Sequence, residues 1–138
     1  GAKLGRLDNK RAIDEAADLL ASLRLIDVAN EKTRNLAYGK QRLIEIALAL
    51  AAKPQVLLLD EPAAGVPTGE SRELFETIAR LPRDVTILLI EHDMDLVFRF
   101  ADRISVLVNG ALLTEDTPEA IANDKRVKEV YLGEAIHG

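Results

Sequence analysis

Two adjacent carboxylates follow one of the most apolar stretches of the sequence. Val56–Leu59 is a continuous apolar run that leads directly into Asp60, Glu61 and Pro62. Such a run is typical of a strand covered on both faces, and open α/β sheets bind ligands at the carboxyl edge of their strands. At that edge Asp60 could hold Mg²⁺, and Glu61 could polarise a water that attacks a phosphate. Taken alone, the run is equally a buried strand that ends in an acidic turn.

Two further segments carry groups that could meet the same phosphate. Ile90–Asp93 (IEHD) ends a second apolar run, so His92 would emerge at the same sheet edge and donate a hydrogen bond to a terminal phosphate. Leu36–Arg42 (LAYGKQR) places Gly39 just before a helix, whose first amides can bind an anion. On their own, the first is more simply a surface histidine, and the second a glycine-containing loop.

The elements that must position these residues are helices first, and then strands alternating with helices. Apolar periodicity and turn residues define them. The predicted strands are Val56–Leu59, Val85–Ile90, Ile104–Val108 and Ala111–Thr114, the last two joined by an Asn109-Gly110 hairpin turn. The predicted helices span about 13–23 and 39–52, start at the caps Thr68, Asp93 and Thr117, and end with one that stops at Leu132 before Gly133. This alternation implies an α/β fold with a mostly parallel sheet.

Composition excludes several classes of function. The absence of cysteine rules out disulfides, thiolate catalysis and cysteine-based zinc sites, and His92 and His137 lie too far apart for a helical metal motif. A net charge of −5 gives no basic surface for nucleic acid. No apolar run approaches the roughly 20 residues of a membrane helix, and the charged start does not resemble a signal peptide, so we expect a cytoplasmic location.

The order and spacing of the three motifs resemble the ATP-binding subunit of ABC transporters. LAYGKQR is followed after 13 residues by VLLLDEP, and then by a small-residue loop and IEHD, as in the second half of such a subunit. The resemblance implies part of a P-loop NTPase core together with part of the helical signature subdomain. It places the helical subdomain at residues 3–53 and the catalytic core at residues 54–138.

The resemblance also implies a role for each motif. The signature segment would contact ATP held by a second ATPase subunit, and the loop Ala63–Pro67 would be the D-loop that couples the two ATP sites. The implied roles are: Ala37, Tyr38, Gly39 and Lys40 for the partner's ATP, Gly65 and Val66 for the D-loop, Asp60 for Mg²⁺, Glu61 as the catalytic carboxylate, and His92 as the switch histidine. Lys40 stands where the family usually has glutamine, and Pro67 replaces a polar residue.

Finer details resemble the ATPases of branched-chain amino-acid importers. These are LAYG, DEPAAGV, LLIEHDM and the late stretch TPEAIANDKRVKEVYLGEA. The ATPases of lipopolysaccharide export are the alternative, because they share the YLGE ending, but LAYG and EPAAG favour the importer. The resemblance implies permease subunits and a second ATPase subunit as partners, and a peripheral place on the inner face of the cell membrane.

No G-x-x-x-x-G-K-[ST] phosphate-binding loop occurs in the 138 residues. We therefore expect the second half of an ATPase subunit, inactive in ATP hydrolysis by itself. A sheet without its other half would expose apolar surface or open edges, and we expect self-association. A non-catalytic interaction domain that docks a permease or another ATPase is a competing interpretation. An ABC ATPase that acts outside transport is a third, against which His92 and the importer-like tail argue.

Overall fold

The computed structural model describes the backbone of residues 2–130 and the side chains of residues 9–130. Two compact units make up the chain, one ending at Glu91 and the other beginning at His92. The division at residues 53 and 54 concerns the subdomains of a whole ATPase and stays a prediction. Among the described residues, no helix is both long enough and apolar enough to cross a membrane.

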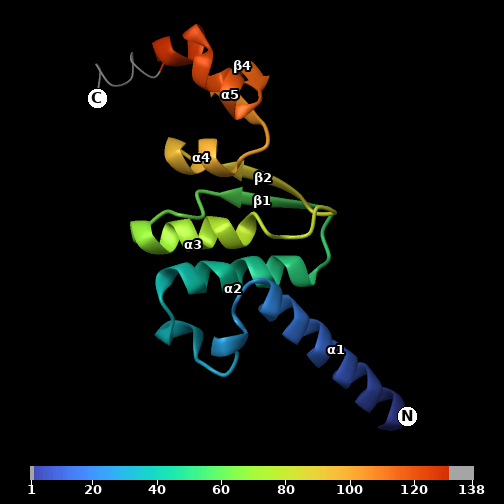
Figure 1. Cartoon of the computed structure of the whole chain (residues 1–138). Helices are drawn as coiled ribbons and strands as arrows, with labels where there is room; N and C mark the ends of the chain where they lie inside the picture. The colour runs from blue at the N-terminus through green and yellow to red at the C-terminus, as the bar shows by residue number, and fades with distance from the viewer. Residues whose placement is uncertain (1, 131–138) are drawn as a thin grey trace. The chain divides into compact units, whose positions relative to one another are not determined.

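The first unit contains three helices and a pair of parallel strands. Its elements are α1 (Ala2–Ser22), α2 (Tyr38–Ala51), β1 (Val56–Asp60), α3 (Thr68–Ile78) and β2 (Thr86–Ile90), with 3-10 turns at Ile26–Val28 and Thr33–Asn35. β1 and β2 pair in parallel, in a register that runs from Val56 opposite Thr86 to Asp60 opposite Ile90. Figure 1 shows α2 and α3 on the same side of this pair. The predicted parallel pairing is confirmed.

The core of the first unit lies between these two helices and one face of β1. Apolar periodicity predicts Leu43, Ile46, Ala47 and Leu50 as the inner side of α2, and all but the half-buried Leu50 are buried. The buried apolar residues here are Leu43, Ile46 and Ala47 of α2, Leu57 and Leu59 of β1, Leu74, Phe75 and Ile78 of α3, and Leu81.

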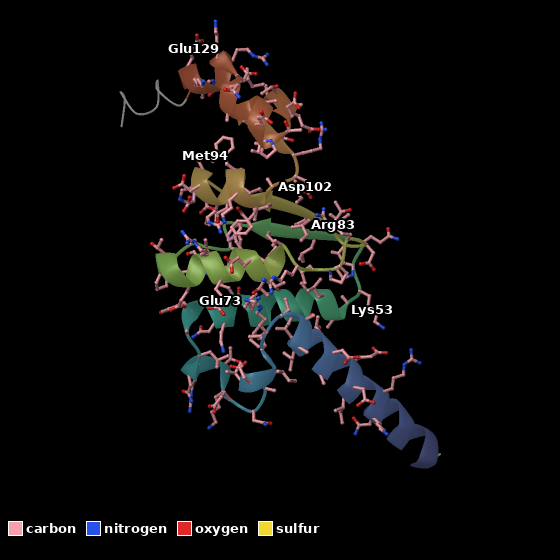
Figure 2. All side chains as sticks on the ribbon, viewed as in Figure 1. Lys53, Glu73, Arg83, Met94, Asp102 and Glu129 are labelled. Carbon is pink, nitrogen blue, oxygen red and sulfur yellow. The ribbon has the colours of Figure 1, made fainter. Side chains whose placement is uncertain are left out.

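Helix α1 is held mainly by the residues that directly follow its C-terminal end. Leu23 and Leu25 are fully buried, whereas Ile13 within the helix is 59% exposed. Lys53 Nζ, labelled in Figure 2, lies 3.2 Å from Glu15 Oε2, which adds an exposed ion pair between α1 and the end of α2. Exposed pairs of this kind contribute little to stability, so the buried leucines hold the helix in place.

The outer face of the strand pair is open, so the apolar surface expected for a sheet without its other half is exposed, and the strand covered on both faces that the run alone indicates is not found. Leu57 and Leu59 are 4% and 9% exposed, but Leu58 between them is 69% exposed. On β2, Leu88 and Ile90 are each 58% exposed. Side chains alternate along a strand, and no element in the described part of the first unit covers the outer set. The apolar run therefore predicts the strand correctly but has a partner on only one face.

The second unit carries an antiparallel hairpin between short helices. Its elements are α4 (Met94–Phe100), β3 (Ile104–Val108), β4 (Ala111–Asp116) and α5 (Pro118–Asn123), and residues 125–130 are helical. β3 pairs with β4 and does not extend the parallel pair. The predicted hairpin turn is confirmed, since Asn109 and Gly110 have φ of 50° and 77°, as the tightest hairpin turns require. The predicted helix end at Leu132 and Gly133 lies outside the described residues.

Helix starts in the structure agree with two of the three predicted caps. The Asp93 side chain accepts hydrogen bonds from the amides of Asp95 and Leu96, and the Thr117 side chain accepts one from the amide of Ala120. The third prediction is off by one position, because Thr68 is already helical and Pro67 occupies the cap position without a side-chain bond. Pro67, in an extended conformation, takes the position before the helix. Thr68 is therefore the first helical residue and cannot act as the cap.

Leu57 and Leu58 are a matched pair of neighbours on opposite faces of β1, and they test this packing. Leu57→Ala should lower the free energy of unfolding by about 2–5 kcal/mol, because it leaves a cavity in the core. Leu58→Ala should lower it by less than about 1 kcal/mol, because that side chain is largely exposed. Urea unfolding followed by circular dichroism measures both, and equal losses would contradict the one-sided burial.

Candidate functional site

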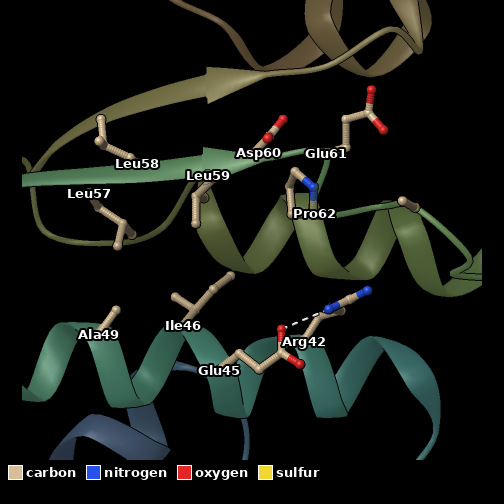
Figure 3. Close-up of a pocket in the computed structure, with 11 residues that line it drawn as sticks. Arg42, Glu45, Ile46, Ala49, Leu57, Leu58, Leu59, Asp60, Glu61 and Pro62 are labelled. Atoms are coloured by element: carbon tan, nitrogen blue, oxygen red, sulfur yellow. Dashed lines mark hydrogen bonds and ion pairs between the residues drawn. The ribbon is translucent and has the colours of Figure 1, made fainter.

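Strand β1 delivers two exposed carboxylates to the carboxyl end of the parallel pair. Asp60 is the last residue of the strand, and Glu61 continues the ladder by one bond, from its N–H to the carbonyl oxygen of Ile90 at 2.8 Å. Figure 3 shows both side chains extending from this end of β1, away from α2. The structure thus brings the two predicted acidic residues together, and their roles in metal binding and hydrolysis stay predictions.

Glu61 adopts a backbone conformation that sequence reasoning missed. Its φ is 45°, in the left-handed region that residues with a Cβ rarely enter. Its carbonyl oxygen then accepts the N–H of Ala64 at 2.9 Å, so the chain turns sharply directly after the strand. Strained residues of this kind concentrate at functional sites, where they aim a side chain. No local sequence signal distinguishes this glutamate from one in an ordinary turn.

The loop after Glu61 is anchored by a second carboxylate that the sequence did not single out. The amide of Ala63 donates to Glu91 Oε1 at 3.3 Å. Glu91 lies just beyond the end of β2, so the start of the predicted D-loop is fastened to the neighbouring strand. Gly65 within this loop has φ of 75°, a conformation that glycine adopts without strain.

An open cavity of about 600 Å³ borders the acidic pair. It lies between α2 and β1, along the edge of β1 that has no paired strand in the described residues. Ile46 and Leu57 are apolar lining residues, and Arg42 and Glu45, which form a 2.8 Å ion pair, also line the cavity (Figure 3). The lining of the cavity therefore combines apolar side chains with charged ones that include Asp60 and Glu61.

The segment Leu36–Arg42, which we call the signature segment, forms the start of α2. Ala37 occupies the cap position and has no side-chain cap bond, and Tyr38 is 64% exposed. Gly39 is buried, and its N–H donates to Glu70 Oε2 at 2.9 Å. The amide predicted to meet a phosphate is thus held in this structure by a carboxylate from α3. Sequence reasoning did not identify Glu70.

Lys40, the departure from the family pattern, is engaged within the chain. Its Nζ lies 2.9 Å from Asp27 Oδ2 in the 3-10 turn that follows α1. The hydrogen bond from this ammonium lowers the pKa of the Asp27 carboxyl below its usual range. A lysine in the first turn of a helix opposes the helix dipole, and a nearby carboxylate offsets that cost. Its predicted contact with a nucleotide stays a prediction.

Asp60 suits magnesium better than a metal held by protein ligands alone. In the described part of the chain, no group of three or more acidic or histidine residues could hold a metal ion. Mg²⁺ commonly binds one or two carboxylates and completes its shell with water and substrate phosphates. A single exposed aspartate fits that pattern. His92 is exposed and opens the second unit, directly before the capping residue Asp93, and its role as a switch stays a prediction.

Comparisons with solved structures define the class of fold. An ATP-binding cassette of an ABC transporter in its ADP conformation superposes with a TM-score of 0.78 at 30% identity, covering 89% of this chain and 50% of the other. A nucleotide-free ATP-binding cassette gives 0.76 at 32% identity, covering 88% and 50%. The fold is therefore part of a P-loop NTPase of the ATP-binding cassette class.

Comparisons of sequence point to ABC transporters as well. A model of ABC transporters matches residues 5–64, and one of branched-chain amino acid ATP-binding cassette transporters matches residues 111–137. The high-affinity branched-chain amino acid transport ATP-binding protein LivG of Escherichia coli K12 is 48% identical over 94% of this chain, and BraF of Pseudomonas aeruginosa is 44% identical over the same share. Along nearly its whole length the chain is therefore similar to the ATP-binding proteins of branched-chain amino acid ABC transporters. It spans 52% of the length of each of these two relatives.

Two substitutions at Glu61 isolate the backbone strain from the side chain. Both Glu61→Gly and Glu61→Ala remove the carboxylate. The left-handed backbone at this position is unfavourable for alanine, which has a Cβ, but not for glycine. We expect the glycine variant to be more stable than the alanine variant by about 1 kcal/mol. Urea unfolding of the two variants measures the difference, and an alanine variant of equal or greater stability would contradict the strain.

Proposed function

We propose that this chain supplies the second half of an ATP site in an ABC ATPase that powers import of branched-chain or related hydrophobic amino acids. The observation that carries the proposal is the placement of Asp60 and Glu61 side by side at the carboxyl end of a parallel strand pair. Its support is the 48% identity to LivG, a branched-chain amino acid transport ATP-binding protein.

The proposed chemistry is transfer of the terminal phosphoryl group of ATP to water. Asp60 would hold Mg²⁺, which neutralises charge on the phosphates when bound. Glu61 would accept a proton from the attacking water, a role that typically contributes about 10²–10⁴-fold to the rate. His92 would donate a hydrogen bond to the terminal phosphate. The 138 residues hold no P-loop, so the other phosphates need a cradle from elsewhere.

The same proposal names the partners. The exposed Tyr38 and its neighbours Ala37 and Gly39 would face ATP bound to a second ATPase subunit, and Gly65 and Val66 would lie in the D-loop between the two sites. Permease subunits would hold the pair at the inner face of the cell membrane. The match of residues 111–137 to the branched-chain amino acid type favours the importer over lipopolysaccharide export.

A chimera tests the proposed hydrolysis. The chain alone should not hydrolyse Mg-ATP, whereas a chimera that joins the first half of Escherichia coli LivG to this chain should do so. In the chimera, Glu61→Gln should lower turnover at least about 100-fold, because the amide cannot accept the proton. Phosphate release under saturating Mg-ATP measures both.

Glu119→Gln, an exposed glutamate on α5, is the matched control and should leave turnover unchanged. Turnover by the chain alone that disappears in Glu61→Gln would overturn the claim that a phosphate cradle is missing. An inactive but folded chimera would contradict the proposed function and favour a non-catalytic interaction domain.

The open face of the strand pair supports a further expectation, that the chain associates with itself. Leu58 and Leu88 are paired in register and are 69% and 58% exposed, so they form a contiguous apolar surface. Leu58→Lys should shift the chain toward monomer in size-exclusion chromatography with light scattering. Leu48→Lys, at a 72% exposed position on α2, is the control and should not. An unsubstituted chain that is monomeric at micromolar concentration would contradict the expectation.

A further inference from the structure

Helix α2 begins without a cap from its own sequence. Ala37 at the cap position has no side-chain hydrogen bond, and the first amide bonded within the helix is that of Gln41, which donates to the carbonyl oxygen of Ala37 at 3.0 Å. The amides of the first helical turn lack partners in their own helix. The N–H of Gly39 therefore needs an acceptor from another part of the chain.

That acceptor is Glu70, 31 residues further along the chain. Its Oε2 accepts the Gly39 N–H at 2.9 Å in a partly buried setting. Glu70 also lies in the first turn of α3, where a negative charge interacts favourably with that helix's own dipole. One carboxylate thus lies at the N-terminal ends of two helices, α2 and α3, and stabilises both.

The fit around Glu70 explains why residue 39 is glycine. A Cβ added to Gly39 would lie 3.2 Å from the Cβ of Glu70 and 3.3 Å from its Oε2. Both distances are shorter than ordinary van der Waals contact, so a larger residue would push the carboxylate away. Gly39 and Glu70 are therefore matched to each other.

The first turn of α3 also holds the end of the predicted D-loop. Ser71 Oγ donates toward the carbonyl oxygens of Val66 and Pro67, each at 3.2 Å. Glu70 on one side and Ser71 on the other link the signature segment and the loop to the same helical turn. A displacement of the signature segment or of the loop would therefore be transmitted to the other through this turn.

We propose that Glu70 is a positioning residue that fastens the signature segment to the start of α3, and so aligns it with the loop Ala63–Pro67. This inference rests on the proposed function, in which both segments face ATP at the contact with a second subunit. Glu70 acts through Gly39 and does not itself touch the nucleotide.

Hydrogen exchange of the Gly39 amide in the whole chain tests the contact directly. In ¹⁵N spectra, Glu70→Ala should speed exchange of this amide about 10- to 100-fold, because it loses its charged acceptor. Glu70→Gln keeps an oxygen acceptor on a side chain of the same length, so it should restore most of the protection of the Gly39 amide. Amides of the α3 core, such as Phe75, should exchange at the unsubstituted rate in both variants.

Glu73→Ala is the matched control, because Glu73 (labelled in Figure 2) is on the same helix and lines a small cavity together with Gly39 and Glu70. The Gly39 N–H, however, is bonded to Glu70. The control substitution should therefore leave Gly39 exchange unchanged. Gly39 exchange that is equal in Glu70→Ala and the unsubstituted chain would overturn the proposal. So would acceleration of equal size in Glu73→Ala, which would indicate general loosening.

The LivG chimera then reports whether the contact matters for hydrolysis. Per folded molecule, Glu70→Ala should lower turnover about tenfold, Glu70→Gln should recover most of it, and Glu73→Ala should not change it. Full turnover in Glu70→Ala, with Gly39 protection lost, would overturn the positioning role. An inactive unsubstituted chimera would instead contradict the proposed function, while the exchange measurement still decides whether Glu70 holds Gly39.

Discussion

Burial of one face of β1 against α2 and α3 is the constraint on which the rest of the candidate site depends. Leu57 and Leu59 point into the core, and each buried leucine contributes about 1.5–3 kcal/mol. Because side chains alternate, this burial fixes which way Asp60 faces. A slip of one residue would bury Leu58 and rotate the acidic pair to the other side of the strand. The position of the carboxylates is therefore set by two leucines that take no part in chemistry.

The opposite face of the strand pair has no such burial. Leu58, Leu88 and Ile90 are as apolar as the buried residues, yet each is more than half exposed. Burial on one side suffices to define the strand and its register, but it leaves an apolar surface that soluble proteins rarely display.

Local signals predicted the elements, and the structure shows why they did so. The Asp93 and Thr117 side chains cap helices by bonding amides only two or three residues further on. The hairpin turn likewise involves only Asn109 and Gly110. Contacts distant in sequence were not predictable in this way. The bond from Gly39 to Glu70 spans 31 residues, and that from Ala63 to Glu91 spans 28. No spacing rule identifies a glutamate whose partner is a backbone amide, and likewise the left-handed backbone of Glu61 follows from the strand ladder and not from its own preference.

These distant contacts explain how a strained glutamate can persist at the end of β1. A left-handed residue with a side chain costs about 1–2 kcal/mol. On one side of Glu61 the ladder bond to Ile90 holds its amide, and on the other the bond from Ala64 closes the turn. Glu91 holds Ala63 within that same turn, and a hydrogen bond to a charged group contributes about 1.5–3 kcal/mol. These contacts are sufficient to offset the strain, so the direction of the Glu61 carboxylate depends on the strand ladder and on a second carboxylate beside β2.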